Sequence, residues 1–561
     1  MKPGDTMDDY YDLGSHSCPI TTTSAQAQSW FDRGLIWTYA YNHQEARECF
    51  KRALEHDPGC AMAFWGISYS LGPNYNMPWA LYDDQGRTKA LAGAHDAMQK
   101  AQALIAGVTT VEAALINALS ARYPQAELAP EMHAWDHDFA DAMRAAFADH
   151  PDQLDLRTVY AESLLNLTPW KMWDLKSGTP AQGAATQEAQ EVMESAMADD
   201  PAAMSHPGLL HLYVHLMEMS PHPEKALKAG DVLRTLAPDA GHLVHMPTHI
   251  DVLCGHYHNV VHWNQKAVQA DLKYYHREGP LNIYTGYRQH NYHFVIYGAL
   301  FLGQMDAALE AVQGMFDTVP EEILRIKSPP NADYFESYMA MGPHILIRFG
   351  RWEEAIALQL PDDQTLYCTL TATTHYARAV AYAATGRVDE AEAEEVLYIA
   401  ARNRIPESRL LHNNRVVDLF EIATQMLRGE IEYRKENYDA AFAHLRASVA
   451  FDDNLPYDEP WGWMQPTRHA LGALLLEQGH VAEAEAVYRD DLGLSGALSR
   501  ATVHPDNVWS LKGLHDCLKA RGERCEIISV KQRLDLALAR ADAAVCASCF
   551  CAQAAMRPKG A

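Results

Sequence analysis

The chain has 561 residues, of which 48% are hydrophobic and 21% charged, and its formal net charge is −27. This composition is that of a folded protein with a large apolar core, and it excludes intrinsic disorder. The acidic excess would repel polyanions, so we expect neither nucleic acid nor an acidic membrane as a partner.

Targeting signals are not evident in the sequence. No stretch approaches the roughly 18 unbroken apolar residues of a membrane helix, and the N-terminal MKPGDTMDDYYDLG lacks an apolar signal core. The 10 cysteines are too sparse for a disulfide scaffold. We therefore expect a cytoplasmic protein with reduced thiols, and in the tail CASCFC (546–551) we favour buried thiols over a zinc site.

The first repeat signal follows residues 1–24, which we expect to form an extended N-terminal arm. Residues 30–58 read WFDRGLIWTYAYNHQEARECFKRALEHDP. Large residues recur there at helical spacing, and the small residues Gly34 and Ala46 would let two helices approach closely. The pattern resembles one tetratricopeptide unit, a pair of packed helices.

A short turn signature recurs later in the chain. It comprises Gly or Asn, a polar residue, a hydrophobe and then an Ala on the second helix. It begins at Gly255, Gly303, Gly350, Gly386, Asn437 and Gly479. Glycine closes a helix in the left-handed conformation, and asparagine can replace it. Since almost no stretch alternates with period two, we predict an all-α fold: a tetratricopeptide-like α-solenoid of degenerate helix pairs, curved into a superhelix with a concave face.

The expected array has three parts after the arm. Residues 25–200 form N-terminal helices with a GPNYN insertion, residues 201–310 form a histidine-rich part with the candidate metal site, and residues 311–561 form a C-terminal array with the cysteine-containing tail. We expect FDDNLPYDEPWGWMQP (451–466) to be a loop that interrupts this array.

The N-terminal part contributes three candidate site residues. Asn74 and Asn76 of the insertion are candidates for substrate binding, although a plain helix-terminating loop would explain them equally well. Glu162 lies on a mostly apolar helix, where a carboxylate needs a partner or a raised pKa. It is a candidate metal ligand or general base, and an ordinary salt bridge is the simpler explanation.

Three expected helices in the histidine-rich part each carry a histidine pair. The pairs are His211–His215, His245–His249 and His290–His293. Glu218 follows the first pair on the same helical face. Pro247 lies inside the second pair and should kink a helix or begin one.

Convergent imidazoles suit late transition metals, and burying so many for unrelated reasons would require many separate hydrogen-bond partners. We therefore predict these six histidines as metal ligands, with Glu218 as a ligand or base. The ligand set favours copper or zinc, and iron is possible. The alternative is a set of ordinary core or surface histidines. We expect solvent exposure for the others in this part: His222, His256, His258, His262 and His276.

Further side chains interleave with these histidines. Tyr213, Tyr287 and Tyr292 can orient ligands, bind an aromatic substrate or simply pack in the core. Arg288 can pair with a substrate carboxylate or with Glu218. No phosphate-binding loop, dinucleotide fingerprint or serine-nucleophile motif is present, so no nucleotide cofactor is expected.

Taken together, several segments resemble a family of bacterial and fungal tetratricopeptide repeat proteins. The segments are ITTTSAQAQSWFDRGL, YNHQEARECF, DPGCAMAFWGISYSLGPNYN, HPGLLHLYVHLMEMS, GHLVHMPTHI, RQHNYHF and ASCFC. The family's three histidine motifs match at His211 and His215, at His245 and His249, and at His290 and His293. Thr248 stands where the family has serine. The resemblance covers nearly the whole chain and implies the helical repeat fold, but no particular reaction.

Different classes of function remain open. The first is a metal-dependent enzyme acting on a small organic molecule, by oxidation with copper or iron and dioxygen, or by metal-assisted hydrolysis. The alternative is a non-catalytic interaction scaffold that holds a peptide in its concave groove, the commoner role of such repeats, although a peptide groove would more often show a Lys, Arg and Asn clamp than histidines. A third is a metal-storing or metal-sensing protein.

Overall fold

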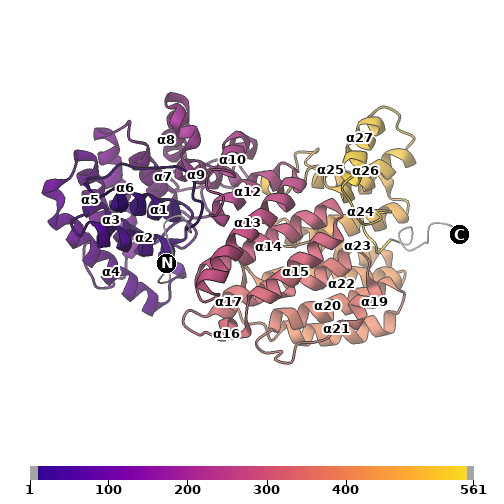
Figure 1. Ribbon diagram of the computed structural model, residues 1–561. Helices are drawn as coiled ribbons and strands as arrows, with labels where there is room; N and C mark the ends of the chain where they lie inside the picture. Colours follow the sequence, from indigo (N-terminus) through magenta and orange to yellow (C-terminus); the bar gives the residue numbers. More distant parts are fainter. Residues whose placement is uncertain (1–9, 553–561) are drawn as a thin grey trace. The chain divides into compact units, whose positions relative to one another are not determined.

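The computed structural model describes residues 10–552 and divides them into two compact units (Figure 1). Unit 1 comprises the chain up to Ile250 together with Lys266–Arg288, and unit 2 comprises Asp251–Gln265 and the chain from Gln289 onward. The division therefore falls inside the histidine-rich part, 201–310. Residues 1–9 of the expected arm and 553–561 of the expected tail lie outside the described residues.

Unit 1 is built from consecutive helices that pack in pairs. Its helices are α1 (Ala25–Tyr39), α2 (His43–His56), α3 (Ala61–Leu71), α4 (Asp84–Ala103), α5 (Thr110–Arg122), α6 (Met132–Asp149), α7 (Leu154–Leu165), α8 (Thr186–Asp199), α9 (Pro207–Glu218), α10 (Leu227–Leu233) and α11 (Gly241–His245). Three further helices contribute residues to both units: α12 (Pro247–Leu253), α13 (Tyr257–Glu278) and α14 (Tyr284–Leu302).

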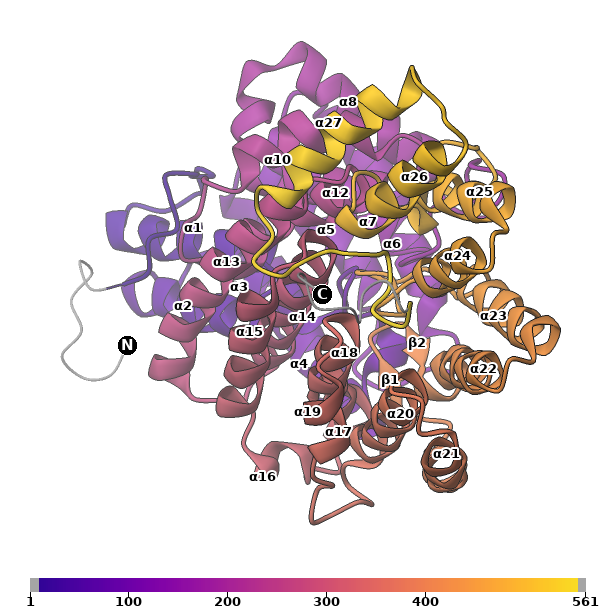
Figure 2. The same cartoon turned by 90° about the vertical axis from the view of Figure 1, so that its right-hand side faces the viewer.

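Unit 2 continues the pattern of paired helices. Its elements are α15 (Met305–Thr318), α16 (Glu321–Leu324), α17 (Asn331–Phe335), α18 (Met341–Arg348), α19 (Trp352–Ala357), α20 (Cys368–Ala384), α21 (Val388–Arg402), β1 (Leu410–Leu411), β2 (Asn414–Arg415), α22 (Val416–Arg434), α23 (Tyr438–Asp452), α24 (Thr467–Glu477), α25 (Val481–Asp491), α26 (Val508–Ala520) and α27 (Glu526–Leu538). The pairs α20–α21, α22–α23, α24–α25 and α26–α27 follow one another along an arc (Figure 2). The all-α, tetratricopeptide-like prediction is confirmed.

The first helix pair, α1–α2, shows why this sequence packs as a repeat. A Cβ atom at Gly34 would lie 2.6 Å from the ring of Phe50, so only glycine lets the two helices approach this closely. Ala46 is fully buried in the same interface. Side-chain oxygens of Ser24 and Asn42 cap the N-termini of α1 and α2. Small residues and caps together fix the pair, and the close approach at Gly34 and Ala46 is the one that the sequence predicts.

The recurring turn signature has the expected backbone at its glycines. Gly255, Gly303, Gly350, Gly386 and Gly479 all have positive φ, between 62° and 82°. The sixth turn differs from the prediction, because the residue with positive φ is Glu436, at 62°, and Asn437 is the N-cap of α23. The left-handed residue there precedes the asparagine, and a non-glycine residue accepts the strained conformation.

Residues 10–24 are extended and are held to the helices of unit 1. The Tyr10 hydroxyl donates to Glu45 at 2.6 Å, and the backbone N–H of Thr21 donates to Glu112 at 2.7 Å. The Glu112 side chain also completes the capping box of α5 with Thr109. One buried carboxylate thus joins the arm to a helix start.

Two other expectations concern loops and membranes. The segment between α23 and α24 is a loop, as predicted, and its Trp461, Trp463 and Met464 side chains are buried. Among the helices of residues 10–552, none combines the length and apolar character that crossing a membrane requires.

Candidate metal centre

Helix α9 carries the first part of the histidine cluster in unit 1. The ring of His206 caps this helix by accepting a hydrogen bond from a first-turn backbone N–H at 3.1 Å, and a proline follows it at the first helical position. His211, His215 and Glu218 then follow at spacings of four and three residues, which places them on one face. All three are buried, with at most 1% of each exposed.

Helices α11 and α12 supply the second part. His242 and His245 lie on α11, and His249 lies on α12; all three are buried. Pro247 is the first residue of α12. It therefore begins a helix, the second of the two geometries that the sequence left open, because its ring is compatible with the first turn.

Hydrogen bonds to the outer ring nitrogens fix where the imidazole protons lie. His211 donates through Nδ1 to the carbonyl oxygen of Tyr39 at 2.7 Å. One carboxylate oxygen of Glu218 accepts a hydrogen bond from His215 Nδ1 at 3.0 Å, and the other accepts one from His249 Nδ1 at 2.7 Å. Because a carbonyl or a carboxylate only accepts, these Nδ1 atoms carry the protons, and the Nε2 atoms keep their lone pairs.

The inner nitrogens lie close together. His211 Nε2 and His242 Nε2 are 3.1 Å apart, and His245 Nε2 and His249 Nε2 are 2.7 Å apart. The ligand atoms of His211, His215 and His242 all lie within 4.8 Å of one another. Two nitrogens bound tetrahedrally to one zinc-sized ion are about 3.3 Å apart, given bonds of about 2.0–2.1 Å. The cluster needs little movement to hold an ion.

Burial favours the neutral form of His211 and His242. Desolvation holds the pKa of His211 and of His242 well below the ordinary value, and the neighbouring histidines lower both pKa values further. A neutral imidazole is the form that binds a metal. At neutral pH each of these two rings therefore has one ring nitrogen without a proton.

Aromatic rings enclose the cluster. The ring of Tyr41 lies 4.7 Å from that of His211 and 5.5 Å from that of His242. Tyr75, from the GPNYN insertion, lies 4.5 Å from His215, and Tyr287 lies 4.6 Å from His242. Neither the buried hydroxyl of Tyr41 nor Nδ1 of His242 has a hydrogen-bond partner within residues 10–552. The site is thus an apolar enclosure with two buried polar atoms that a ligand or water could satisfy.

Glu162 lies near this cluster without the salt bridge that the sequence favours. It is 3% exposed, accepts a short hydrogen bond from the Tyr69 hydroxyl, and forms no ion pair with any described residue. Burial raises its pKa, and the hydrogen bond from Tyr69 acts in the opposite direction. The partner of Glu162 is thus the Tyr69 hydroxyl and not the expected cation. Because no cation of residues 10–552 is paired with this carboxyl, Glu162 stays a candidate general base.

The other candidates of unit 1 have contacts of their own. Asn74 is buried against the ring of His43, at 3.4 Å, and Asn76 is half-buried. The Tyr213 hydroxyl donates to Glu194 of α8 at 3.0 Å. Arg288 is fully buried and lies over the ring of Tyr275, at 4.7 Å.

The third predicted pair belongs to unit 2. The ring of His290 stacks on that of His412 at 5.1 Å. His293 Nε2 lies 3.0 Å from the sulfur of Met464, and burial lowers the pKa of His293 to about 3. Tyr292 packs against α15 at Gly314, where a Cβ atom would clash with its ring.

Histidines expected at the surface are exposed: His222, His256, His258, His262 and His276. The cysteines of the tail differ from the expectation of buried thiols. Cys549 and Cys551 form a disulfide, since their Cα atoms lie 5.2 Å apart, within disulfide range. Cys546 is a half-buried thiol.

A second polar cluster in unit 1 joins the arm to the helices. The Asp155 carboxylate accepts hydrogen bonds from His16 Nε2 at 3.0 Å, from His206 Nε2 at 3.1 Å and from the Tyr39 hydroxyl at 2.7 Å. The two imidazoles hold the pKa of Asp155 well below its ordinary value, although burial alone would raise it. Nδ1 of His206 caps α9, so both ring nitrogens of His206 are used in hydrogen bonds. We therefore interpret this cluster as a structural link between the N-terminal arm and the helices.

Three residues at the site were not predicted to belong to it: His242, Tyr41 and Tyr75. His242 precedes His245 by three residues, so the same spacing argument would have included it as a ligand. Tyr41 and Tyr75 lie in a repeat turn and in the insertion. Only the folded chain shows that their rings cover the histidines.

Comparisons with known proteins identify a repeat. A tetratricopeptide repeat model matches residues 27–60, the α1–α2 pair. Curated proteins give no match. Among solved structures, the APC/C hetero-tetramer Cut9–Hcn1 aligns with 13% identity, covering 88% of this chain and 76% of that chain, with a TM-score of 0.30. Naa15/Naa10 bound to HypK-THB aligns with 12% identity, covering 91% and 70%, with a TM-score of 0.22.

Proposed function

We propose that this protein is an interaction scaffold of tetratricopeptide-type helix pairs whose unit 1 binds a transition-metal ion. The matched repeat at residues 27–60 and the successive helix pairs support the scaffold. Such arrays present extended surfaces made from neighbouring repeats, and these surfaces suit a peptide or protein partner.

One observation carries the metal site: three buried imidazoles, His211, His215 and His242, have ligand atoms within 4.8 Å of one another. Two of the rings are oriented by hydrogen bonds from Nδ1 to the Tyr39 carbonyl and to the Glu218 carboxylate. Acceptors of this kind orient metal-binding histidines and fix their tautomers. A set of neutral nitrogens favours zinc or copper over iron, since few carboxylates are at hand.

Elemental analysis tests the metal site directly. Protein purified without an affinity tag and dialysed against a weak chelator should retain one zinc or copper ion per chain. The His215→Ala variant should lose it, and the matched His276→Ala variant, which removes an exposed histidine, should keep it. Absence of metal after reconstitution with both ions would reject the site. Circular dichroism of each variant verifies that the helices remain folded.

The scaffold has a separate test. A partner recovered by crosslinking should, once purified, form a stoichiometric complex with this protein in gel filtration. That complex should persist in the metal-free His215→Ala variant if partner binding rests on the helix pairs alone. Failure to form any stoichiometric complex would count against the scaffold.

A metal-dependent enzyme is the second candidate, and the ligand count favours it. Three histidines leave a fourth tetrahedral position, as in catalytic zinc sites, and the buried carboxyl of Glu162 lies within electrostatic range of His215. Zinc would supply an activated water, and copper or iron would supply dioxygen chemistry on a small organic molecule. Hydrolysis of an ester and amide panel, or oxygen consumption, should then require the metal and fall in Glu162→Gln. A protein that only stores or senses metal would show neither activity.

A further inference from the structure

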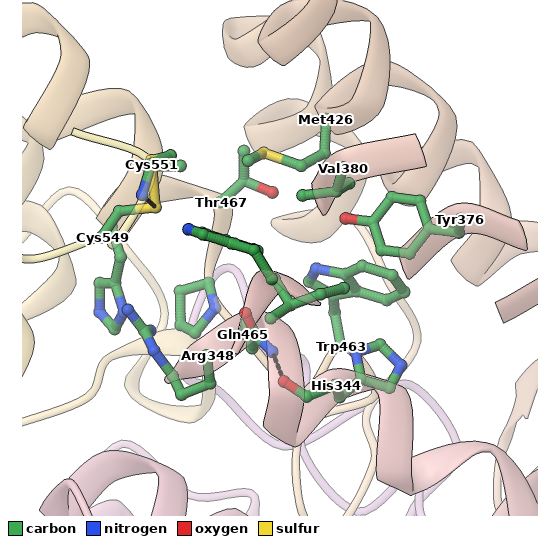
Figure 3. Close-up of a pocket in the computed structure, with 15 residues that line it drawn as sticks. His344, Arg348, Tyr376, Val380, Met426, Trp463, Gln465, Thr467, Cys549 and Cys551 are labelled. Atoms are coloured by element: carbon green, nitrogen blue, oxygen red, sulfur yellow. Dashed lines mark hydrogen bonds between the residues drawn. A yellow bond between two sulfur atoms is a disulfide. The ribbon is translucent and has the colours of Figure 1, made fainter. Parts of the chain in front are cut away.

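Unit 2 contains a pocket that none of the preceding functions uses (Figure 3). It is bordered by α18, α20, α22, α24 and the disulfide segment, and it is partly open to solvent.

The lining of the pocket is mainly apolar. Its larger apolar and aromatic side chains are Trp352, Tyr376, Val380, Met426 and Trp463. Polar groups are few and include Arg348, Gln465 and Thr467. In Figure 3, Tyr376 and Trp463 lie across the pocket from Cys549 and Cys551, and Arg348 lies below the cysteines. An apolar enclosure with a few placed polar groups is the usual form of a small-molecule site.

Arg348 is the charged group of this pocket. Only 4% of it is exposed, and its guanidinium lies 3.9 Å from the ring of Trp509. One terminal nitrogen donates to His469 Nδ1 at 2.8 Å, and the other donates to the carbonyl oxygen of Ser548 at 2.7 Å. Its buried Nε–H has no acceptor within residues 10–552. Both direct acceptors are uncharged, and part of the donor set is unused.

The nearest counter-charge is occupied elsewhere. Asp491 lies on the far side of His469, whose Nε2 it binds at 3.0 Å. The same carboxylate also accepts from His504, Asn507 and Ser510. Arg348 forms no ion pair with any carboxylate that the structure describes. A buried cation without a directly bound anion is costly, and an anionic ligand in the pocket would offset that cost.

We propose that this pocket binds a small organic monocarboxylate with an aromatic or branched aliphatic body. The apolar side chains cover the body of the ligand, and the unused donors of Arg348 hold its carboxylate. Guanidinium–carboxylate hydrogen bonds are among the strongest in proteins. A single cation matches a single negative charge, and the net charge of −27 disfavours polyanions.

Ligand variation on the unaltered protein provides the primary test. Isothermal titration with 3-phenylpropanoate, 4-methylpentanoate and the neutral 3-phenylpropanamide compares charge at nearly constant shape. At least one acid should bind, and 3-phenylpropanoate should bind roughly tenfold or more tightly than its amide, because hydrogen bonds to charged groups are stronger. Equal affinity for acid and amide, or no binding of either acid, would overturn the proposal.

Variants then locate the binding. Arg348→Gln should reduce the affinity for the acid to that for the amide, whereas Arg446→Gln, at an exposed arginine, should leave it unchanged. Since Arg348 also supports Ser548 and His469, Met426→Trp gives an independent check, because it fills the pocket without touching the arginine. It should abolish binding of both ligands. Unchanged acid binding in either pocket variant would place the ligand elsewhere and overturn the proposal.

Discussion

Replacing Glu218 by glutamine should weaken metal binding in unit 1 while preserving the fold. Glu218 accepts hydrogen bonds from His215 Nδ1 and His249 Nδ1 at 3.0 and 2.7 Å. A glutamine amide offers one accepting oxygen, and its NH₂ group faces the other ring. That ring must then keep its proton on Nε2, its inner nitrogen, or turn away. Loss of an acceptor that orients a metal-binding histidine costs about 10–100-fold in metal affinity, about 1.4–2.7 kcal/mol.

Competition of the reconstituted zinc protein against a chromophoric chelator measures this loss. Glu224→Gln is the matched control, because Glu224 is exposed and pairs with an exposed histidine. It should bind zinc as the unaltered protein does. Unchanged affinity in Glu218→Gln would refute the assignment of Glu218 as the group that orients the ligand His215.

Two further predictions concern stability. Gly34→Ala should lower the free energy of unfolding by about 1–3 kcal/mol, because the new Cβ would lie 2.6 Å from the Phe50 ring; urea denaturation measures it, and Gly107→Ala, with open space around its Cβ position, is the control. Burial lowers the pKa of His344 from 6.5 to about 4. The unfolded chain therefore takes up the proton first, so His344 contributes no penalty above pH 6.5 and destabilises the protein progressively as the pH falls to about 4. Relative to His344→Asn, the unaltered protein should lose up to about 3 kcal/mol over that range; parallel pH profiles would contradict this.

The helical repeat was predictable because its determinants are local. Gly34 and Ala46 permit close helix packing, and the turn glycines such as Gly386 close helices at positive φ. The turn at Asn437 shows that the turn signature does not by itself identify which residue adopts the left-handed conformation. The preceding residue, Glu436, adopts the left-handed conformation there, because tertiary packing can impose a backbone that propensity disfavours.

The division into units was not visible in the sequence. It falls within α12, α13 and α14, which are continuous helices without the Pro-, Gly- or Ser-rich linkers that usually mark a boundary. Composition therefore indicated one histidine-rich part at 201–310, whereas the compact units assign His249 and His290 to different bodies.

The candidate site was predictable only where helical spacing decides which side chains share a face. The i, i+4 spacing of His211 and His215 places both on the inner face of α9, with Glu218 behind them. The role of Tyr41 depends on a contact between a repeat turn and a helix far away in the sequence. Glu162 likewise has Tyr69, 93 residues away, as its partner, and no periodic pattern reports such a pairing.

The most direct measurement is anomalous diffraction from crystals of the metal-loaded protein, recorded above and below the zinc and copper absorption edges. Our account predicts one strong peak per chain, about 2.0–2.1 Å from Nε2 of His211, His215 and His242. No peak at this position, or a peak only at exposed histidines such as His258 and His262, would contradict the metal centre.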